Sequence, residues 1–277
     1  MSYKTILVHL NDKRRAEAML EPAIQLATRY NSHLMGLHVD AVMAAPPLSL
    51  TYASSGLGTV AAEERENGEA IAALFTRMTA TGTCVAEWQR LKVPLGDLVS
   101  VVVEHGRTAD LVVAGQADPD WDLSPVLDFP ERLALESGRP VLVIPYVGRY
   151  PLIGRNVVIA WKAGRETTRA VFDALPLLKG AENVHILEVK GRVDEKSLGT
   201  DTSIAASLAR HGVKSTVRTS VAPDISVADE ILSRLSDLDA DLLVMGAYGH
   251  SRLREYVLGG ATRHIAQYMT VPTLWSH

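Results

Sequence analysis

The stretch that decides the fold is Gly246-Ala-Tyr-Gly249-His250-Ser251-Arg252, which is followed by Leu258-Gly259-Gly260-Ala261-Thr262. It comes directly after Leu242-Leu243-Val244-Met245, an apolar run typical of a parallel strand buried on both faces. Glycines at the end of such a strand can take positive φ and let a ligand approach backbone N–H groups. A helical pattern over residues 261–268 follows, and a helix N-terminus attracts anions. We therefore expect this backbone to bind a phosphate group, with plain turn and cap glycines as the alternative.

Composition limits the class of protein. The chain has 277 residues, 47% of them hydrophobic and 22% charged, and a formal net charge of −4. This balance predicts a globular protein and does not favour nucleic acid or an anionic membrane as a partner. The single cysteine, Cys84, excludes an internal disulfide, and no apolar run has the length of a membrane span. Without a signal-peptide pattern at the N-terminus, we expect a cytoplasmic protein.

The N-terminal half alternates buried-type strands with amphipathic helices. The pattern predicts strands over residues 5–10, 33–39, 84–91, 109–115 and 140–145, and helices over 16–27, 61–80 and 96–106. Asp12 is the expected N-cap of the first helix. Such alternation predicts a parallel, doubly wound sheet, in which ligands bind at the carboxyl ends of the strands.

Residues 40–58 interrupt this alternation. They are rich in Ala, Pro, Ser and Gly and have no clear period, so a long loop is expected. A loop of this length either covers a pocket or partner surface, or is a mobile excursion.

After a linker at residues 146–155, the pattern starts again. Strands are expected over residues 156–161, 184–189, 214–221, 242–245 and 271–275, and helices over 165–178, 203–211, 225–235 and 261–268. The clearest internal match sets Ala109-Asp-Leu-Val-Val-Ala-Gly115 against Ala240-Asp-Leu-Leu-Val-Met-Gly246. The repeat predicts an α/β fold with two tandem doubly wound parallel five-stranded sheets, in domains 1–147 and 154–277.

The spacing Gly246, two residues, Gly249, nine residues, Gly259 resembles the nucleotide-binding signature of the universal stress protein family. Gly260 stands where that family has Ser or Thr, and Thr262 supplies a hydroxyl two residues later. The order of elements resembles a tandem member. The resemblance implies an adenine-nucleotide-alpha-hydrolase-like fold and the cofactor ATP, with AMP, ADP and Mg²⁺ as further candidates. It implies phosphate and ribose contacts from Gly246, Gly249, Gly259, Gly260 and Thr262.

Two further positions correspond to the family's base-binding residues. Lys162 stands where the family usually has an Asp that contacts adenine, and Asn11 stands there in the first half. Lysine cannot accept a hydrogen bond, so Lys162 either meets an anion or points to solvent. Val189 matches a position that lines the base in the family, and an ordinary core valine is the alternative.

The matching stretch of the first half departs from the signature. Gly115 is present, but Asp118 replaces the second glycine, and Leu127, Asp128 and Pro130 occupy the late positions. Pro130 removes a backbone N–H donor. The four aspartates of this stretch would oppose a phosphate, since one like charge costs on the order of 1 kcal/mol near a surface; they are Asp118, Asp120, Asp122 and Asp128. We expect no nucleotide phosphate to bind in this half.

No other motif predicts chemistry. The sequence has no G-x-x-x-x-G-K-S/T loop and no G-x-S-x-G elbow, and its nine histidines lack metal-ligand spacing. We therefore assign no catalytic residue and no metal ligand, and slow ATP hydrolysis is a third hypothesis without an obvious base.

The leading hypothesis is a stress-response regulatory module that binds nucleotide through its C-terminal domain. The alternative is a degenerate scaffold that acts through protein contacts or another small ligand. Family members pair through their last strands, which implies that residues 141–143 meet residues 271–275 within one chain and that a homodimer can also form. Such pairing would protect the sheet edges.

Overall fold

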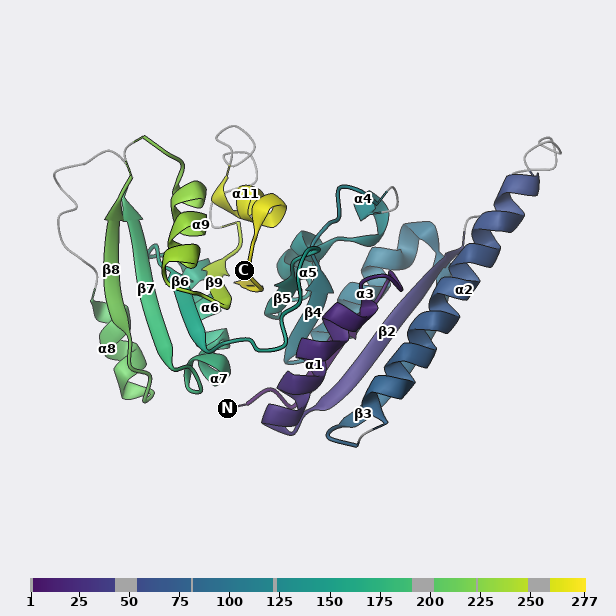
Figure 1. Ribbon diagram of the computed structural model, residues 1–277, viewed down its shortest axis with the longest axis horizontal. Helices are drawn as coiled ribbons and strands as arrows, with labels where there is room; N and C mark the ends of the chain where they lie inside the picture. The colour runs from purple at the N-terminus through teal and green to yellow at the C-terminus, as the bar shows by residue number, and fades with distance from the viewer. Residues whose placement is uncertain are drawn as a thin grey trace.

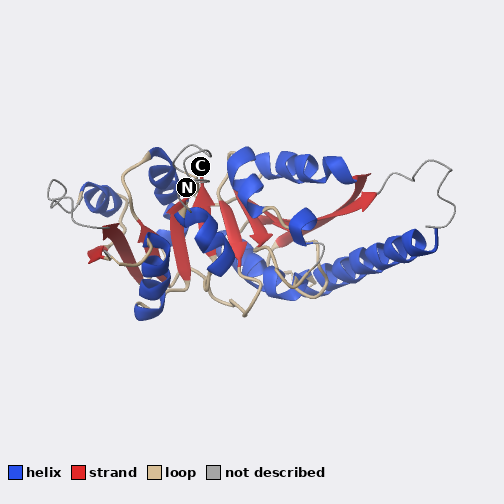
Figure 2. Ribbon diagram, turned by 90° about the horizontal axis from the view of Figure 1, so that it is seen from above, coloured by secondary structure: helices blue, strands red, loops and turns tan. Residues whose placement is uncertain are grey.

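A computed structural model describes residues 2–42, 54–80, 82–121, 124–190, 202–222, 224–248 and 260–277. One ten-stranded sheet runs through the molecule, with strand order β3-β2-β1-β4-β5-β10-β9-β6-β7-β8. In Figure 1 the N-terminal half lies on the right in purple to teal, and the C-terminal half lies on the left in green to yellow. Seen from above, helices cover both faces of the strands (Figure 2). Among the described residues, no helix combines the length and apolar character needed to cross a membrane.

The two halves repeat one order of elements. The N-terminal half contains β1 (Thr5–His9), α1 (Ala16–Tyr30), β2 (His33–Val42), α2 (Ser54–Thr79), β3 (Val85–Pro94), the short 3₁₀ turn η1 (Leu95–Asp97), α3 (Leu98–Arg107), β4 (Leu111–Gly115), α4 (Ser124–Leu127), α5 (Pro130–Glu136) and β5 (Val141–Ile144). The C-terminal half contains β6 (Asn156–Ala160), α6 (Arg165–Asp173), α7 (Leu175–Leu178), β7 (Asn183–Lys190), α8 (Ser203–Arg210), β8 (Thr216–Val221), α9 (Val227–Asp237), β9 (Leu242–Gly246), α11 (Ala261–Tyr268) and β10 (Thr273–Ser276).

The two predicted five-stranded sheets join at their last strands. Within each half, all neighbouring strands are parallel. At the junction β5 and β10 run antiparallel, with Thr273 opposite Val143 and Trp275 opposite Val141. The predicted α/β fold and the predicted pairing of the last strands are therefore confirmed. The junction removes two sheet edges that would otherwise expose unpaired backbone groups.

The core has two layers because successive strand residues point to opposite faces of the sheet. On β1, Ile6 and Val8 join one cluster, which packs under α1, α2, α6, α7 and α8. Leu7 joins the other cluster, under α3, α5, α9 and α11. The continuous apolar runs of the central strands are explained by this burial on both faces.

Three predicted element boundaries are wrong. Helix α2 begins at Ser54 and β2 extends to Val42, so the loop predicted at residues 40–58 is too long; its residues 43–53 lie outside the described part of the chain. Asp12 does not cap α1, because its Oδ1 accepts the backbone N–H of Arg14 at 2.9 Å and the helix begins only at Ala16. The helix predicted at 165–178 divides into α6 and α7, where Pro176 lacks a backbone N–H.

Candidate functional site

Gly246 ends β9 and lies against the first turn of α6. A Cβ at this position would come within 2.5 Å of the backbone nitrogen of Thr167 and 2.7 Å of the carbonyl carbon of Glu166. Gly246 has no positive φ, and Gly260 has a φ of −57°. These two glycines therefore do not use the positive φ that glycine allows. Glycine is needed at 246 because a protein backbone approaches it closely.

The turn after β9 is connected to the start of α11. Tyr248 has a positive φ of 55°, and its backbone N–H donates to Thr262 Oγ1 at 3.3 Å. Thr262 is 4% exposed, so its hydroxyl lies within this turn. Gly260 is the N-cap of α11, and among the described residues no side chain caps that helix end. The first N–H groups of a helix have no acceptor within the helix, so this end suits an anion.

The other predicted contact residues are Val189, Lys162, Gly249 and Gly259. Val189 is half-buried on β7 and packs against the same core cluster as Tyr248 and Ala261. Its position is consistent with both predicted roles. Lys162 lies two residues after the end of β6 and is exposed. Gly249 and Gly259 lie outside the described residues, so the structure does not place them.

In the N-terminal half, a buried carboxylate occupies the equivalent turn. Asp128 is 8% exposed, and its Oδ1 accepts from Asn11 Nδ2 at 2.8 Å while its Oδ2 accepts from Ser124 Oγ at 2.7 Å. The backbone N–H of Asp118 donates to Ser124 Oγ at 2.8 Å and lies 3.4 Å from Asp128 Oδ2. Burial raises the pKa of Asp128, and the hydrogen bonds from Asn11 and Ser124 oppose that rise. The turn thus contains an anionic group of its own.

A buried arginine completes this N-terminal network. Arg15 is 9% exposed, and its Nη1 lies 3.5 Å from Asp128 Oδ2. Its guanidinium covers Gly115, where a Cβ would meet Nη2 at 2.6 Å. Of the four aspartates expected to repel phosphate, Asp118 is half-buried, Asp120 is exposed and Asp122 lies outside the described residues. Among the described residues of this turn, Asp128 is the buried carboxylate, and the Arg15 guanidinium lies beside it.

Sequence reasoning missed a third group of polar side chains. His38 and Asp40 are two residues apart on β2, and Glu64 on α2 lies beside them. In a strand, residues two apart point to the same face, so His38 and Asp40 could have been recognised from the sequence as a pair of potential metal ligands. Glu64 could not be identified from spacing, because it lies on a different element, α2, and meets β2 only through packing.

Comparisons with known proteins agree with this architecture. Residues 181–276 match the model of the Universal stress protein family. A universal stress protein from Archaeoglobus fulgidus DSM 4304 has a TM-score of 0.65 at 16% identity, with 98% of this chain and 95% of that chain covered. A universal stress protein from Pseudomonas aeruginosa UCBPP-PA14 has a TM-score of 0.52 at 16% identity, and the match covers 99% of this chain and 93% of that chain.

A solved universal stress protein in complex with cAMP covers 44% of this chain and 95% of its own length, at 20% identity and a TM-score of 0.35. No curated protein matches the sequence. By sequence, the match to the Universal stress protein family covers residues 181–276, and the whole chain has the fold of these solved universal stress proteins.

Proposed function

We propose that the C-terminal half binds an adenine nucleotide, with ATP as the expected ligand, and that the protein is a nucleotide-responsive regulatory module of the stress response. The observation that carries this proposal is the difference between the two equivalent turns. In the N-terminal half the buried Asp128 carboxylate accepts hydrogen bonds inside the turn. In the C-terminal half Gly260 stands at the corresponding place, at the N-terminus of α11.

The described residues support an anion at this helix end. The hydroxyl of Thr262 accepts the N–H of Tyr248, which joins the turn after β9 to the first turn of α11. Phosphate oxygens would then accept from backbone N–H groups of this helix end, together with those of Gly249 and Gly259 in the expected signature. Mg²⁺ would accompany the phosphates of ATP as their counter-ion.

Lys162 sets this chain apart from the family pattern. An exposed ammonium near the carboxyl end of β6 cannot accept a hydrogen bond from adenine, but it can pair with a phosphate. We therefore expect phosphate charge to contribute more than base identity. ATP should bind more tightly than AMP, and adenosine should bind weakly.

Isothermal titration calorimetry of the purified chain with ATP, AMP and adenosine tests this proposal, with and without Mg²⁺. Gly249→Asp places in the C-terminal turn the residue type found at Asp118, and it should weaken ATP binding by more than about tenfold through charge repulsion. The matched control is Asp118→Gly, which leaves Asp128 in place and should not change the ATP affinity. ATP binding that is insensitive to Gly249→Asp would contradict the assigned site.

The second candidate function is a scaffold that binds no nucleotide. The lysine at 162 and the glycine at 260, in place of the family's acceptor and hydroxyl, favour it. It predicts no heat of binding and no change in melting temperature with millimolar ATP. A positive ATP titration that Gly249→Asp abolishes would exclude this second candidate.

We also propose that the chain comprises domains 1–147 and 154–277, which meet at the β5–β10 junction, and that two chains can associate. Limited proteolysis should cleave first in residues 146–155 if the connecting segment is the domain boundary. Sedimentation equilibrium would measure the oligomeric state, and a monomer at all concentrations would contradict the homodimer.

A further inference from the structure

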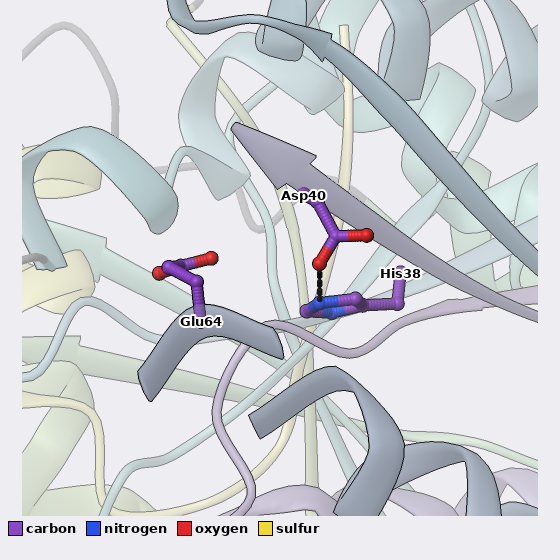
Figure 3. Close-up of side chains that lie close together, drawn as sticks. All are labelled: His38, Asp40 and Glu64. Atoms are coloured by element: carbon purple, nitrogen blue, oxygen red, sulfur yellow. Dashed lines mark ion pairs between the residues drawn. The ribbon is translucent and has the colours of Figure 1, made fainter. Parts of the chain in front are cut away.

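His38, Asp40 and Glu64 lie together at the carboxyl end of β2. Figure 3 shows His38 and Asp40 on the strand near its arrowhead, and Glu64 on a neighbouring helical turn. One ligand atom from each residue lies within 4.8 Å of the other two. His38 is 2% exposed and Asp40 is 7% exposed, whereas Glu64 is half-buried. The group therefore combines one imidazole and two carboxylates, largely out of solvent.

The hydrogen bonds of His38 determine which of its nitrogens carries a proton. Its Nδ1 lies 2.7 Å from the carbonyl oxygen of Leu10, and a carbonyl oxygen can only accept. Nδ1 must therefore donate, and in a neutral ring Nε2 presents a lone pair. That Nε2 is buried, has no hydrogen-bond partner among the described residues, and lies 3.4 Å from Asp40 Oδ1.

Two acceptors that face each other at this distance require positive charge between them. A proton on Nε2 would supply it between His38 and Asp40. Asp40 already shares its charge with Arg90, whose Nε and Nη2 donate to the carboxylate at 2.7 and 2.8 Å. A single proton between His38 and Asp40 would not contact the Glu64 carboxylate, whose ligand atom lies within 4.8 Å of those of the other two residues. A divalent cation would meet the lone pair and both carboxylates together.

We propose that Nε2 of His38 and one carboxylate oxygen each from Asp40 and Glu64 bind a divalent first-row transition metal ion, with Zn²⁺ as the probe. Imidazole and carboxylate are common ligands of such ions, and three protein ligands leave a position for water. The surrounding contacts fit this role. The Leu10 carbonyl orients the imidazole and Arg90 orients the Asp40 carboxylate, as outer partners orient the ligands of other metal sites.

The C-terminal half provides an internal comparison. The strand registers place Glu188 and Lys190 on β7 at the positions of His38 and Asp40 on β2. There, Lys190 Nζ lies 3.6 Å from Glu188 Oε2. Lys190 thus supplies a positive charge in the C-terminal half at the position where the N-terminal half has Asp40. The proposed metal site is confined to the N-terminal half and is separate from the proposed nucleotide site.

The test is zinc binding to the full chain. The protein would be dialysed against a chelator and then titrated with Zn²⁺ in a calorimeter, and its metal content would be measured after re-dialysis. We expect one ion per chain. Glu64→Gln keeps the shape of the side chain and should weaken binding by more than about tenfold, and His38→Gln should abolish it. Glu66→Gln, on the same helix but exposed and paired with Lys13, is the matched control and should have no effect.

The proposal would be overturned by no zinc bound at one equivalent, by equal zinc affinity in Glu64→Gln and Glu66→Gln, or by retention of the ion in a folded His38→Gln protein. Circular dichroism of each variant would establish that it is folded, and Glu64→Gln, at a half-buried position, keeps the test decisive if His38→Gln unfolds. Nitrogen-15 NMR of the metal-free protein provides an independent readout. Protons on both ring nitrogens of His38 near pH 7, with no change on adding zinc, would identify a buried imidazolium instead of a metal ligand.

Discussion

Gly246→Ala is the sharpest test of the packing at the end of β9. The added methyl group would lie 2.5 Å from the backbone nitrogen of Thr167 and 2.7 Å from the carbonyl carbon of Glu166. Both atoms belong to the first turn of α6, which cannot yield without moving the helix away from the sheet. Overpacking against a fixed neighbour costs about 1–3 kcal/mol, and contact with backbone places this substitution at about 2–3 kcal/mol.

Gly115→Ala is the matched control, because Gly115 ends β4 at the equivalent place in the first half. Its added Cβ would meet Arg15 Nη2 at 2.6 Å, which is the far end of a flexible side chain. The guanidinium can move, so the cost should be about 1 kcal/mol. Neither glycine has a positive φ, so the effect of Gly→Ala on the unfolded chain is the same in both and cancels in the comparison.

Urea and thermal denaturation, followed by circular dichroism, would measure the two variants side by side. At about 2–4 °C per kcal/mol, Gly246→Ala should lower the melting temperature by about 4–12 °C, and Gly115→Ala by clearly less. Equal melting temperatures, or a less stable Gly115→Ala protein, would refute the argument that α6 backbone makes glycine necessary at 246.

Three further predictions concern His9, Trp275 and Ser226. The pKa of His9 is lowered from 6.5 to about 3, mainly by burial and to a smaller extent by His38. Between pH 7 and pH 5 the unfolded chain therefore binds a proton at His9 that the folded chain does not bind. The free energy of unfolding, measured in urea titrations, should fall by about 2 kcal/mol over this pH range, and by less in the His9→Phe variant. Trp275→Ala at the strand junction should cost about 3–5 kcal/mol, because the side chain is 0% exposed, and melting curves should show it. Ser226→Ala should cost about 1 kcal/mol by the same assay, because Ser226 Oγ accepts the backbone N–H of Asp229 at the start of α9.

Much of the fold could be predicted because strong local patterns agree with the final environment. Apolar runs such as residues 242–245 become strands buried on both faces, and the match between 109–115 and 240–246 indicates a repeated unit. The pairing of the last strands followed from resemblance to a family, and the register of Thr273 with Val143 confirms it. The ends of helices and strands were less predictable. Helix α2 begins at Ser54 with Ser and Gly residues, which are also typical of loops, so the sequence did not indicate its start.

The candidate sites show where sequence reasoning ends. Sequence alone determined that the C-terminal turn carries glycines and the N-terminal turn carries acid, because residue types can be read directly from the chain. Only the tertiary structure decided that Asp128 turns inward to meet Asn11 and Ser124. It also decided that Glu64 on α2 meets His38 on β2. The contacts of Asp128 with Asn11 and of Glu64 with His38 join residues far apart in sequence, and their distances are set by the packing of helices on the sheet, which no local pattern records.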